Sequence, residues 1–350
     1  MKTVKVGNVL LGGGENIKIQ SMTNISAKNL SACINQINDL EKAGCDIVRI
    51  AIPDEENAKA VSKIKENTSV PIVADIHFDY RLALMCIERG IDKVRINPGN
   101  IGSEENIKKV ALMAKEKNIP IRIGINGGSL EKHLLEKYKS PCAEAMIESA
   151  KGQIEILKKY DFEDVVLSLK SSDVKKTIEA YRLASKTFDC PLHLGVTEAG
   201  TYTQGLVKSA IGIGSLLADG IGDTIRVSLT DDPIKEVYAA KEILNALRLG
   251  KPFVEVVSCP TCARCRINLI EIAKRVNERV KDIPCSLKVA VMGCAVNGPG
   301  EAKDADIGIA GGDKCAILFK KGEIVGKYKE NEIEDVLIDE IKKITNYERN

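Results

Sequence analysis

From residue 17 to about residue 247, short apolar runs rich in β-branched residues alternate with longer stretches in which apolar residues recur every three or four positions. The short runs predict buried strands, and the longer stretches predict amphipathic helices. The expected strands span 17–22, 46–50, 72–76, 93–96, 121–125, 164–168, 192–196 and 224–227, and helices such as 55–67, 104–117 and 173–187 follow them. This repetition is typical of an α/β protein with a (β/α)8 TIM barrel rather than an open sheet.

The segments on either side of this repeat have a different pattern. Residues 4–11, with Gly7-Asn8 in the middle, predict a small hairpin across the bottom of the barrel. Gly250-Lys251-Pro252 ends the last helix, because neither Gly nor Pro continues a helix at low cost. We therefore expect a barrel domain over 1–249 and a smaller α+β domain over 250–350. Its expected strands span 253–258, 287–292, 307–310 and 316–319, and its expected helices span 264–281 and 332–345.

Composition narrows the class of protein. The 350 residues are 44% hydrophobic and 29% charged, a balance that supports a buried core. A net charge of +2 and an aromatic content of 4% give neither a basic footprint nor a stacking surface, so we expect no nucleic-acid partner. No apolar run approaches the ~20 residues of a membrane span, and the first segment lacks the features of a signal peptide. We therefore expect a cytoplasmic protein with no membrane partner.

Charged and polar residues interrupt the strand patterns near their carboxyl ends, where the active sites of such barrels lie. Side chains two or four positions apart share one face of a strand, so Asp75 with His77 and His193 with Thr197 can each form a pair that points inward. The full set comprises Arg49, Asp75, His77, Arg95, Asn97, Arg122, Asn126, Lys170, His193, Thr197 and Arg226. Together these residues predict a barrel mouth with several positive charges.

Two interpretations of these cations are open: they form salt bridges inside the barrel, or they bind an anionic ligand. Burying several cations is costly without anionic partners, and the carboxylates at strand ends are few, mainly Asp75 and Glu198. A ligand with two or more negative charges, such as a diphosphate, accounts for the excess through bidentate arginine contacts.

The eleven cysteines are too scattered for the disulfide framework of a small secreted domain. Cys259 and Cys262 have the spacing that lets two thiolates reach one metal centre, and Cys294 precedes a turn rich in Gly and Pro. The backbone amides of such a turn suit the sulfurs of an iron–sulfur cluster. A structural zinc bound by Cys259, Cys262, Cys265 and Cys294 is the alternative that the spacing leaves open.

Several longer motifs along the chain are specific enough to indicate a family. They are SMTN at 21–24, ADIHFDYRLAL at 74–84, VRINPGNIG at 94–102, IRIGINGGSLE at 121–131, LSLKSSD at 167–173, PLHLGVTEAG at 191–200, GDTIRVSL at 222–229, SCPTC at 258–262 and GCAVNGPGEA at 293–302. In this order they resemble the 4-hydroxy-3-methylbut-2-enyl diphosphate synthase family. The resemblance implies a substrate-binding TIM barrel and a C-terminal domain, similar to the repeat of sulfite reductases, that carries a 4Fe-4S cluster.

The resemblance also implies roles for individual residues. The family's cluster ligands fall on Cys259, Cys262, Cys294 and Glu301. Its diphosphate-binding and active-site positions fall on Arg49, Arg95, Arg122, Asn126, Lys170 and the catalytic Glu198. The residues Asp75, His77, His193, Thr197, Arg226 and Ser228 complete the expected substrate-binding set.

One departure from the family pattern concerns the cluster ligands. Ala263 and Arg264 follow SCPTC where the family usually has Gly-Arg, and Cys265 then offers a thiolate that could compete with Glu301. We favour Glu301, because an oxygen ligand can leave and expose one iron, which a further thiolate would prevent.

The implied activity is the reductive opening of 2-C-methyl-D-erythritol 2,4-cyclodiphosphate, with loss of water, to a linear allylic diphosphate. No nicotinamide fingerprint is evident, so we expect electrons from a ferredoxin or flavodoxin. The short linker after the barrel favours a homodimer in which the partner subunit closes each site. The alternative function is a non-redox phosphate-ligand barrel, either an aldolase-like lyase or a binding protein, with a structural zinc in its tail.

Overall fold

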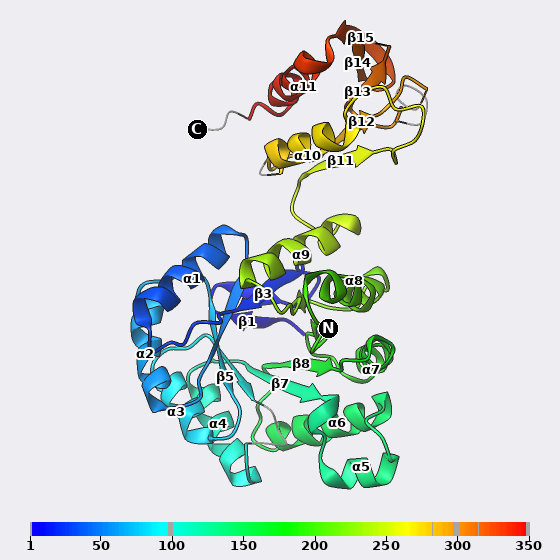
Figure 1. Ribbon diagram of the computed structural model, residues 1–350. Coiled ribbons are helices and arrows are strands. Elements are labelled where there is room, and N and C mark those ends of the chain that lie inside the picture. The colour runs from blue at the N-terminus through cyan, green and yellow to red at the C-terminus, as the bar shows by residue number, and fades with distance from the viewer. Residues whose placement is uncertain (1, 97–100, 282, 297–301, 314, 348–350) are drawn as a thin grey trace. The chain divides into compact units, whose positions relative to one another are not determined.

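The computed structural model describes residues 2–96, 101–281, 283–296, 302–313 and 315–347. The chain divides into two compact units, Met1–Leu249 and Gly250–Asn350, which are coloured blue to green and yellow to red in Figure 1. Each unit has its own apolar core and is described separately.

The first unit contains an 8-stranded parallel sheet with the strand order β8-β7-β6-β5-β4-β3-β10-β9. A parallel bridge between Leu167 and Leu192 joins the two ends of this order, so the strands form a ring. The strands are β3 (Lys18–Met22), β4 (Ile47–Ala51), β5 (Ile72–Ile76), β6 (Lys93–Ile96), β7 (Ile121–Asn126), β8 (Val165–Lys170), β9 (His193–Leu194) and β10 (Thr224–Ile225). The expected TIM barrel is therefore confirmed.

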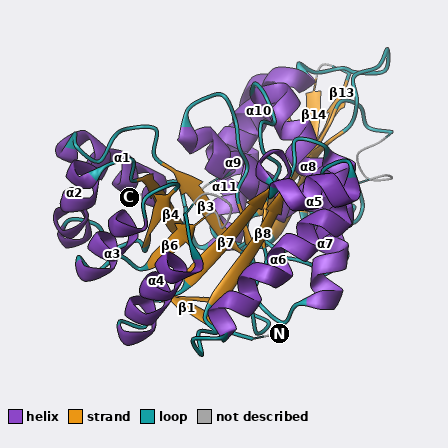
Figure 2. Ribbon diagram, turned by 90° about the horizontal axis from the view of Figure 1, so that it is seen from below, coloured by secondary structure: helices purple, strands orange, loops and turns teal. Residues whose placement is uncertain are grey.

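Helices alternate with the strands and surround them, as Figure 2 shows. They are α1 (Leu30–Lys42), α2 (Glu55–Glu66), α3 (Tyr80–Glu88), α4 (Glu104–Glu116), α5 (Lys132–Tyr138), α6 (Ala143–Lys158), α7 (Val174–Thr187), α8 (Tyr202–Ala218) and α9 (Pro233–Ala246), with a short 3-10 turn at Gly127–Ser129. Asp54, Asp173 and Asp232 begin α2, α7 and α9 by accepting a backbone N–H, as N-cap residues do. No helix in the described ranges has the length and apolar character needed to cross a membrane.

Successive side chains of each barrel strand point alternately toward the surrounding helices and toward the barrel interior. In β4, Val48 and Ile50 belong to the core between strands and helices, whereas Ile47 and Arg49 face the barrel interior. The hairpin β1 (Val4–Val6) and β2 (Val9–Leu11) packs against Ile47 and two further inward residues of the barrel, Val73 and Val166. The expected hairpin at the bottom of the barrel is confirmed, and it covers the inward residues at that end.

The second unit is a 5-stranded mixed sheet with the order β11-β12-β13-β14-β15, covered by two helices. Its elements are β11 (Val254–Ser258), α10 (Leu269–Val280), β12 (Leu287–Met292), β13 (Ile307–Gly312), β14 (Cys315–Lys320), β15 (Glu323–Tyr328) and α11 (Glu330–Thr345). The pairs β11–β12 and β12–β13 are parallel, and the remaining two pairs are antiparallel.

One element boundary in this unit differs from the sequence-based prediction. The helix predicted over 264–281 begins only at Leu269. The segment before it is a turn in which the Cys265 amide donates to the Cys262 carbonyl and the Arg266 amide donates to the Gly293 carbonyl. The bond to Gly293 ties this part of the chain to the end of β12, so the cysteine segment, residues 259–268, stays irregular.

Candidate active site and candidate metal centre

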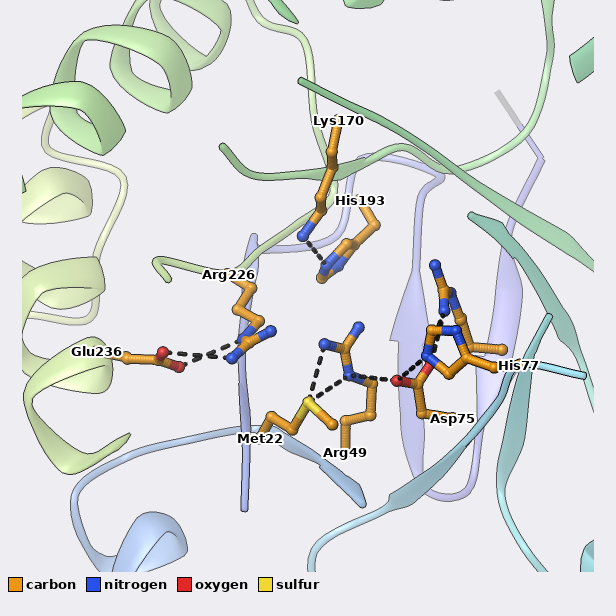
Figure 3. A network of polar contacts seen from close by, with 9 residues as sticks. Met22, Arg49, Asp75, His77, Lys170, His193, Arg226 and Glu236 are labelled. Atoms are coloured by element: carbon orange, nitrogen blue, oxygen red, sulfur yellow. Dashed lines mark hydrogen bonds and ion pairs between the residues drawn. The ribbon is translucent and has the colours of Figure 1, made fainter. Parts of the chain in front are cut away.

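The charged residues predicted from the strand ends lie on inward positions of the barrel and come together at its mouth (Figure 3). They belong to different strands: Arg49 to β4, Asp75 to β5, Arg95 to β6, Arg122 to β7 and Lys170 to β8. Lys93 of β6, which was not predicted, is a further cation of this group. All of them are buried, and Arg122 is only 1% exposed. A concentration of cations this deep inside a protein needs negative charge nearby.

Asp75 is the carboxylate at the centre of this group. Its Oδ1 accepts a hydrogen bond of 3.0 Å from Arg95 Nη1, and its Oδ2 lies 3.9 Å from Arg49 Nε. His77 Nε2 lies 3.1 Å from Asp75 Oδ2 and 3.1 Å from Arg95 Nη1. Burial alone would raise the pKa of Asp75, but Arg49, the His77 contact, Arg95 and Arg122 hold that pKa well below its usual range. Asp75 is therefore a carboxylate at neutral pH.

Arg49 has a weak second partner. Its Nε and Nη2 donate to Met22 Sδ at 3.1 and 2.9 Å, and thioether sulfur is only a weak acceptor. Burial lowers the pKa of Arg49 to about 10, and the neighbouring charges of Arg226 and Arg95 act in the same direction. The guanidinium is still protonated at neutral pH, and its charge is only partly compensated.

Lys93 and Arg122 extend the positive charge deeper into the barrel. Lys93 Nζ and the Nε and Nη1 atoms of Arg122 have no hydrogen-bond partner among the described residues. Burial and the neighbouring cations lower the pKa of both groups well below its usual range. Lys93 was missed in the sequence because it begins a strand, where a lysine looks like a solvated end. Its pairing with Val73 of β5 places it inside the barrel.

Lys170 and His193 form a second buried pair, visible in Figure 3. Lys170 Nζ lies 3.3 Å from His193 Nε2, and His193 Nδ1 lies 3.4 Å from Thr224 Oγ1. When Lys170 is an ammonium group, which can only donate, the ring accepts at Nε2 and carries its proton on Nδ1. Burial and the nearby cations lower the pKa of both Lys170 and His193, so the imidazole stays neutral. A Cβ on Gly195 would lie 2.6 Å from Lys170 Nζ, so this glycine provides the space for the ammonium group.

Arg226, which follows β10, lies on the opposite side of Arg49 from Asp75 in Figure 3. Its Nε and Nη2 each lie 3.3 Å from a carboxylate oxygen of Glu236, a buried residue of α9. Sequence reasoning missed Glu236. The available signal was its place in the buried stripe of α9, with Pro233, Val237 and Ala240, where an acidic residue is unusual.

The remaining candidate residues line the segments that follow the strands. Glu198 is exposed and has a φ of 51°, a left-handed conformation that is uncommon for residues other than glycine. Such strain is concentrated at functional sites. Asn126, Thr197 and Ser228 are half-buried. Asn97 and Glu301 lie outside the described residues.

The cysteine segment follows the carboxyl end of β11 and lies beside the carboxyl end of the neighbouring parallel strand β12. Cys259 directly follows β11, and Gly293 and Cys294 directly follow β12. The Gly293 amide donates to Cys259 Sγ at 3.2 Å. The backbone amide and side chain of Arg264 and the Cys265 amide lower the pKa of the exposed Cys262 thiol. These donors stabilise thiolates, the form in which cysteine binds a metal.

The chemistry of these donors fits a thiolate-bound metal centre, but the described residues do not form a complete one. Within the described ranges, no group of three or more His, Cys, Asp or Glu side chains is close enough to hold a metal ion. Cys265 Sγ donates to the Ile267 carbonyl at 3.2 Å and packs against Gly293, where an added Cβ would lie 2.7 Å from the sulfur. The Cys265 side chain is therefore hydrogen-bonded and packed within the second unit.

Comparisons with known proteins match both units of the chain. The family model of the GcpE TIM-barrel domain matches residues 1–241, and that of the GcpE protein C-terminal domain matches residues 255–343. A Fusobacterium nucleatum relative named 4-hydroxy-3-methylbut-2-en-1-yl diphosphate synthase (flavodoxin) is 58% identical over 98% of this chain and 96% of its own length. A Geobacter sulfurreducens relative of the same name is 53% identical over 98% of this chain and 97% of its own length.

A solved structure of Yersinia pestis dihydropteroate synthase in a sulfonamide drug complex matches with a TM-score of 0.50 at 12% identity. It covers 71% of this chain and 99% of that chain, a likeness that concerns the barrel fold alone. The family models and the relatives together cover both units, so the family predicted from the sequence motifs is confirmed. The chain belongs to the GcpE family.

Proposed function

We propose that this chain reduces 2-C-methyl-D-erythritol 2,4-cyclodiphosphate to 4-hydroxy-3-methylbut-2-enyl diphosphate, a step of isoprenoid precursor biosynthesis. The names of the relatives favour this function over the alternative of a non-redox barrel with a structural zinc. The observation that carries the proposal is the excess of buried cations over carboxylates at the barrel mouth. A cyclic diphosphate supplies the missing negative charge.

The barrel residues would bind and orient this substrate. The phosphate oxygens would be bound by the cations Arg49, Arg95, Arg122, Lys170 and Arg226. The hydroxyl groups and the bridging oxygens would be bound by Asn126, Thr197 and Ser228. The reaction consumes two electrons and two protons: the ring C–O bond to phosphate breaks, one hydroxyl leaves as water, and a carbon–carbon double bond forms. Glu198, an exposed residue of the segment after β9, would supply or take a proton during the reaction.

The cofactor in this proposal is a 4Fe-4S cluster in the second unit. Cys259, Cys262 and Cys294 would hold it, and the family resemblance places the fourth ligand at Glu301. When bound, such a cluster supplies electrons one at a time. The name of the relatives points to flavodoxin as the electron donor, and a ferredoxin is the other electron carrier of this class.

Replacing each ligand cysteine with serine tests the cofactor assignment. We expect Cys259→Ser, Cys262→Ser and Cys294→Ser each to lose bound iron and the visible absorption of the anaerobically purified protein. Cys265→Ser is the matched control and should keep both, because its thiol bonds to the Ile267 carbonyl instead. Iron and sulfide analysis with absorption spectra provides the measurement. A colourless wild-type protein with bound zinc, or loss of iron in Cys265→Ser alone, would contradict the assignment.

We further propose that the protein is a homodimer in which the second unit of one subunit closes the barrel of its partner. The helix α9 begins beside the barrel mouth and runs ~20 Å toward the bottom, at 1.5 Å per residue. The connection to β11 spans residues 247–253, which extend over at most ~25 Å. The proposed closure by the partner subunit rests on this short connection between the two units.

Mixing two inactive variants tests this arrangement. A barrel variant, Glu198→Gln, and a cofactor variant, Cys294→Ser, are each expected to be inactive alone. After subunit exchange, a mixed dimer holds one intact site, so turnover should recover to about a quarter of the wild-type value per subunit, since roughly half of the dimers are mixed. If turnover does not recover although exchange is demonstrated by mass spectrometry, each chain closes its own barrel.

A further inference from the structure

We infer that Glu236 is a positioning residue for the substrate: it orients Arg226 and the segment after β10 toward the bound diphosphate. This inference rests on the proposed function and adds a residue to it. Figure 3 shows Glu236 reaching toward Arg226, which lies between it and Arg49. The carboxylate is only 4% exposed, so it lies behind Arg226 rather than in contact with solvent.

Four donor atoms from three residues converge on this carboxylate. Arg226 Nε lies 3.3 Å from Oε2 and Nη2 lies 3.3 Å from Oε1. The Leu229 amide donates to Oε1 at 3.1 Å, and Ser21 Oγ donates to Oε2 at 3.0 Å. Glu236 therefore fixes the arginine, the backbone beside Ser228, and the strand β3 that carries Met22 against Arg49.

The contact with Glu236 uses one edge of the Arg226 guanidinium. A guanidinium group has five N–H donors in a fixed plane, so an arginine held through Nε and Nη2 keeps Nη1 for another acceptor. Without this contact, the Arg226 side chain would be averaged over several rotamers. The contact with Glu236 therefore sets the plane of the guanidinium group and the direction of Nη1. Preorganisation of this kind strengthens binding by reducing the ordering that binding requires.

The sign of the effect separates positioning from simple electrostatics. A carboxylate near a diphosphate repels it, so if charge alone mattered, removing the charge of Glu236 would tighten binding. If Glu236 acts by orienting Arg226, removing one of its acceptor oxygens weakens binding instead. Glu236→Gln makes this change with almost no change in volume, because an NH₂ group replaces one oxygen.

The test measures cyclodiphosphate affinity by isothermal titration calorimetry on the full-length, cofactor-loaded protein. The variants are Glu236→Gln, Arg226→Ala and the double variant. Glu242→Gln is the matched control, since Glu242 is an exposed residue of the same helix and its replacement changes the net charge equally. We expect Glu236→Gln to weaken affinity about tenfold, as for one charge-assisted hydrogen bond, and Glu242→Gln to leave it unchanged.

The double variant distinguishes action through Arg226 from a general structural role. We expect Glu236→Gln to change affinity by less than about twofold when Arg226 is already alanine, because the group that it orients is then absent. Equal losses in both backgrounds, or tighter binding by Glu236→Gln, would overturn the inference. If Glu236→Gln folds poorly, Ser21→Ala replaces it, since this change removes one support of Oε2 and should weaken affinity in the wild-type background only. Failure of the wild-type protein to bind cyclodiphosphate would instead refute the proposed function.

Discussion

Replacing Asp75 with asparagine is expected to lower the melting temperature of the barrel unit by about 10 °C and to abolish turnover. Asp75 is the carboxylate that Arg95, Arg49 and His77 share inside the barrel. Removing one partner of a buried ion pair leaves an uncompensated charge and costs about 3–5 kcal/mol. For a unit of this size, each kcal/mol corresponds to roughly 2–4 °C in melting temperature.

Thermal unfolding of both proteins as a function of pH checks the cause. Because the folded pKa of Asp75 is held below its unfolded value, its stabilising contribution is fully present above pH ~4 and is lost as the pH falls toward the folded pKa. The difference between wild type and Asp75→Asn should therefore be constant near neutral pH and shrink below pH ~4. Asp39→Asn, at an exposed residue of α1, is the control and should change stability by less than ~0.5 kcal/mol. Equal melting temperatures of Asp75→Asn and wild type would contradict this account.

Replacing Arg122 with methionine should have the opposite effect on stability and a large effect on binding. Arg122 is buried, and its Nε and Nη1 have no partner among the described residues. Its charge therefore destabilises the folded protein when no ligand is bound. Methionine fills similar space without a charge, and such replacements of buried ionic groups are often stabilising by about 1–4 kcal/mol. We therefore expect a higher melting temperature together with a loss of cyclodiphosphate affinity on the order of 30-fold or more, equivalent to about 2 kcal/mol.

Calorimetric titration and thermal unfolding on the same preparation measure both effects. Arg182→Met is the control, because Arg182 is an exposed residue of α7 that pairs with Asp219, and it should leave affinity unchanged. The absorption of the cofactor in the other unit should be the same in all three proteins. If Arg122→Met lowers the melting temperature and binds the substrate normally, Arg122 is part of the fold and not of the binding site.

The sequence was sufficient to predict the barrel because its strands alternate between two surroundings with different requirements. Outward positions such as Val48 and Ile50 need apolar residues, and inward positions such as Arg49 tolerate charge only near the mouth. A charged residue at regular places in otherwise apolar strands is therefore a visible signal of both fold and site. Residues 193–194 and 224–225 form shorter strands than expected, because the chain leaves the ladder soon after them to form the loops that carry Thr197 and Ser228.

Other features depended on three-dimensional contacts that have no local signature. Glu236 resembles an ordinary helical glutamate until α9 places it against Arg226. Lys93 resembles a strand end until the register with Val73 places it inside the barrel. The late start of α10 follows from a bond between Arg266 and Gly293, which lie on different segments of the second unit. In each case the local pattern can at most mark a residue as unusual, because the partner that determines its contact is distant in sequence.

Anaerobic turnover followed by phosphorus NMR is the measurement that tests the proposed function most directly. The cofactor-loaded protein, reduced flavodoxin and 2-C-methyl-D-erythritol 2,4-cyclodiphosphate are mixed, and the signals of the cyclic diphosphate are followed over time. Our account predicts that they are replaced by those of a linear diphosphate, with two electrons consumed per product, and that Glu198→Gln and Cys294→Ser form none. Cyclodiphosphate that remains intact with reduced, cofactor-loaded wild-type protein, although calorimetry shows it to be bound, would contradict the account.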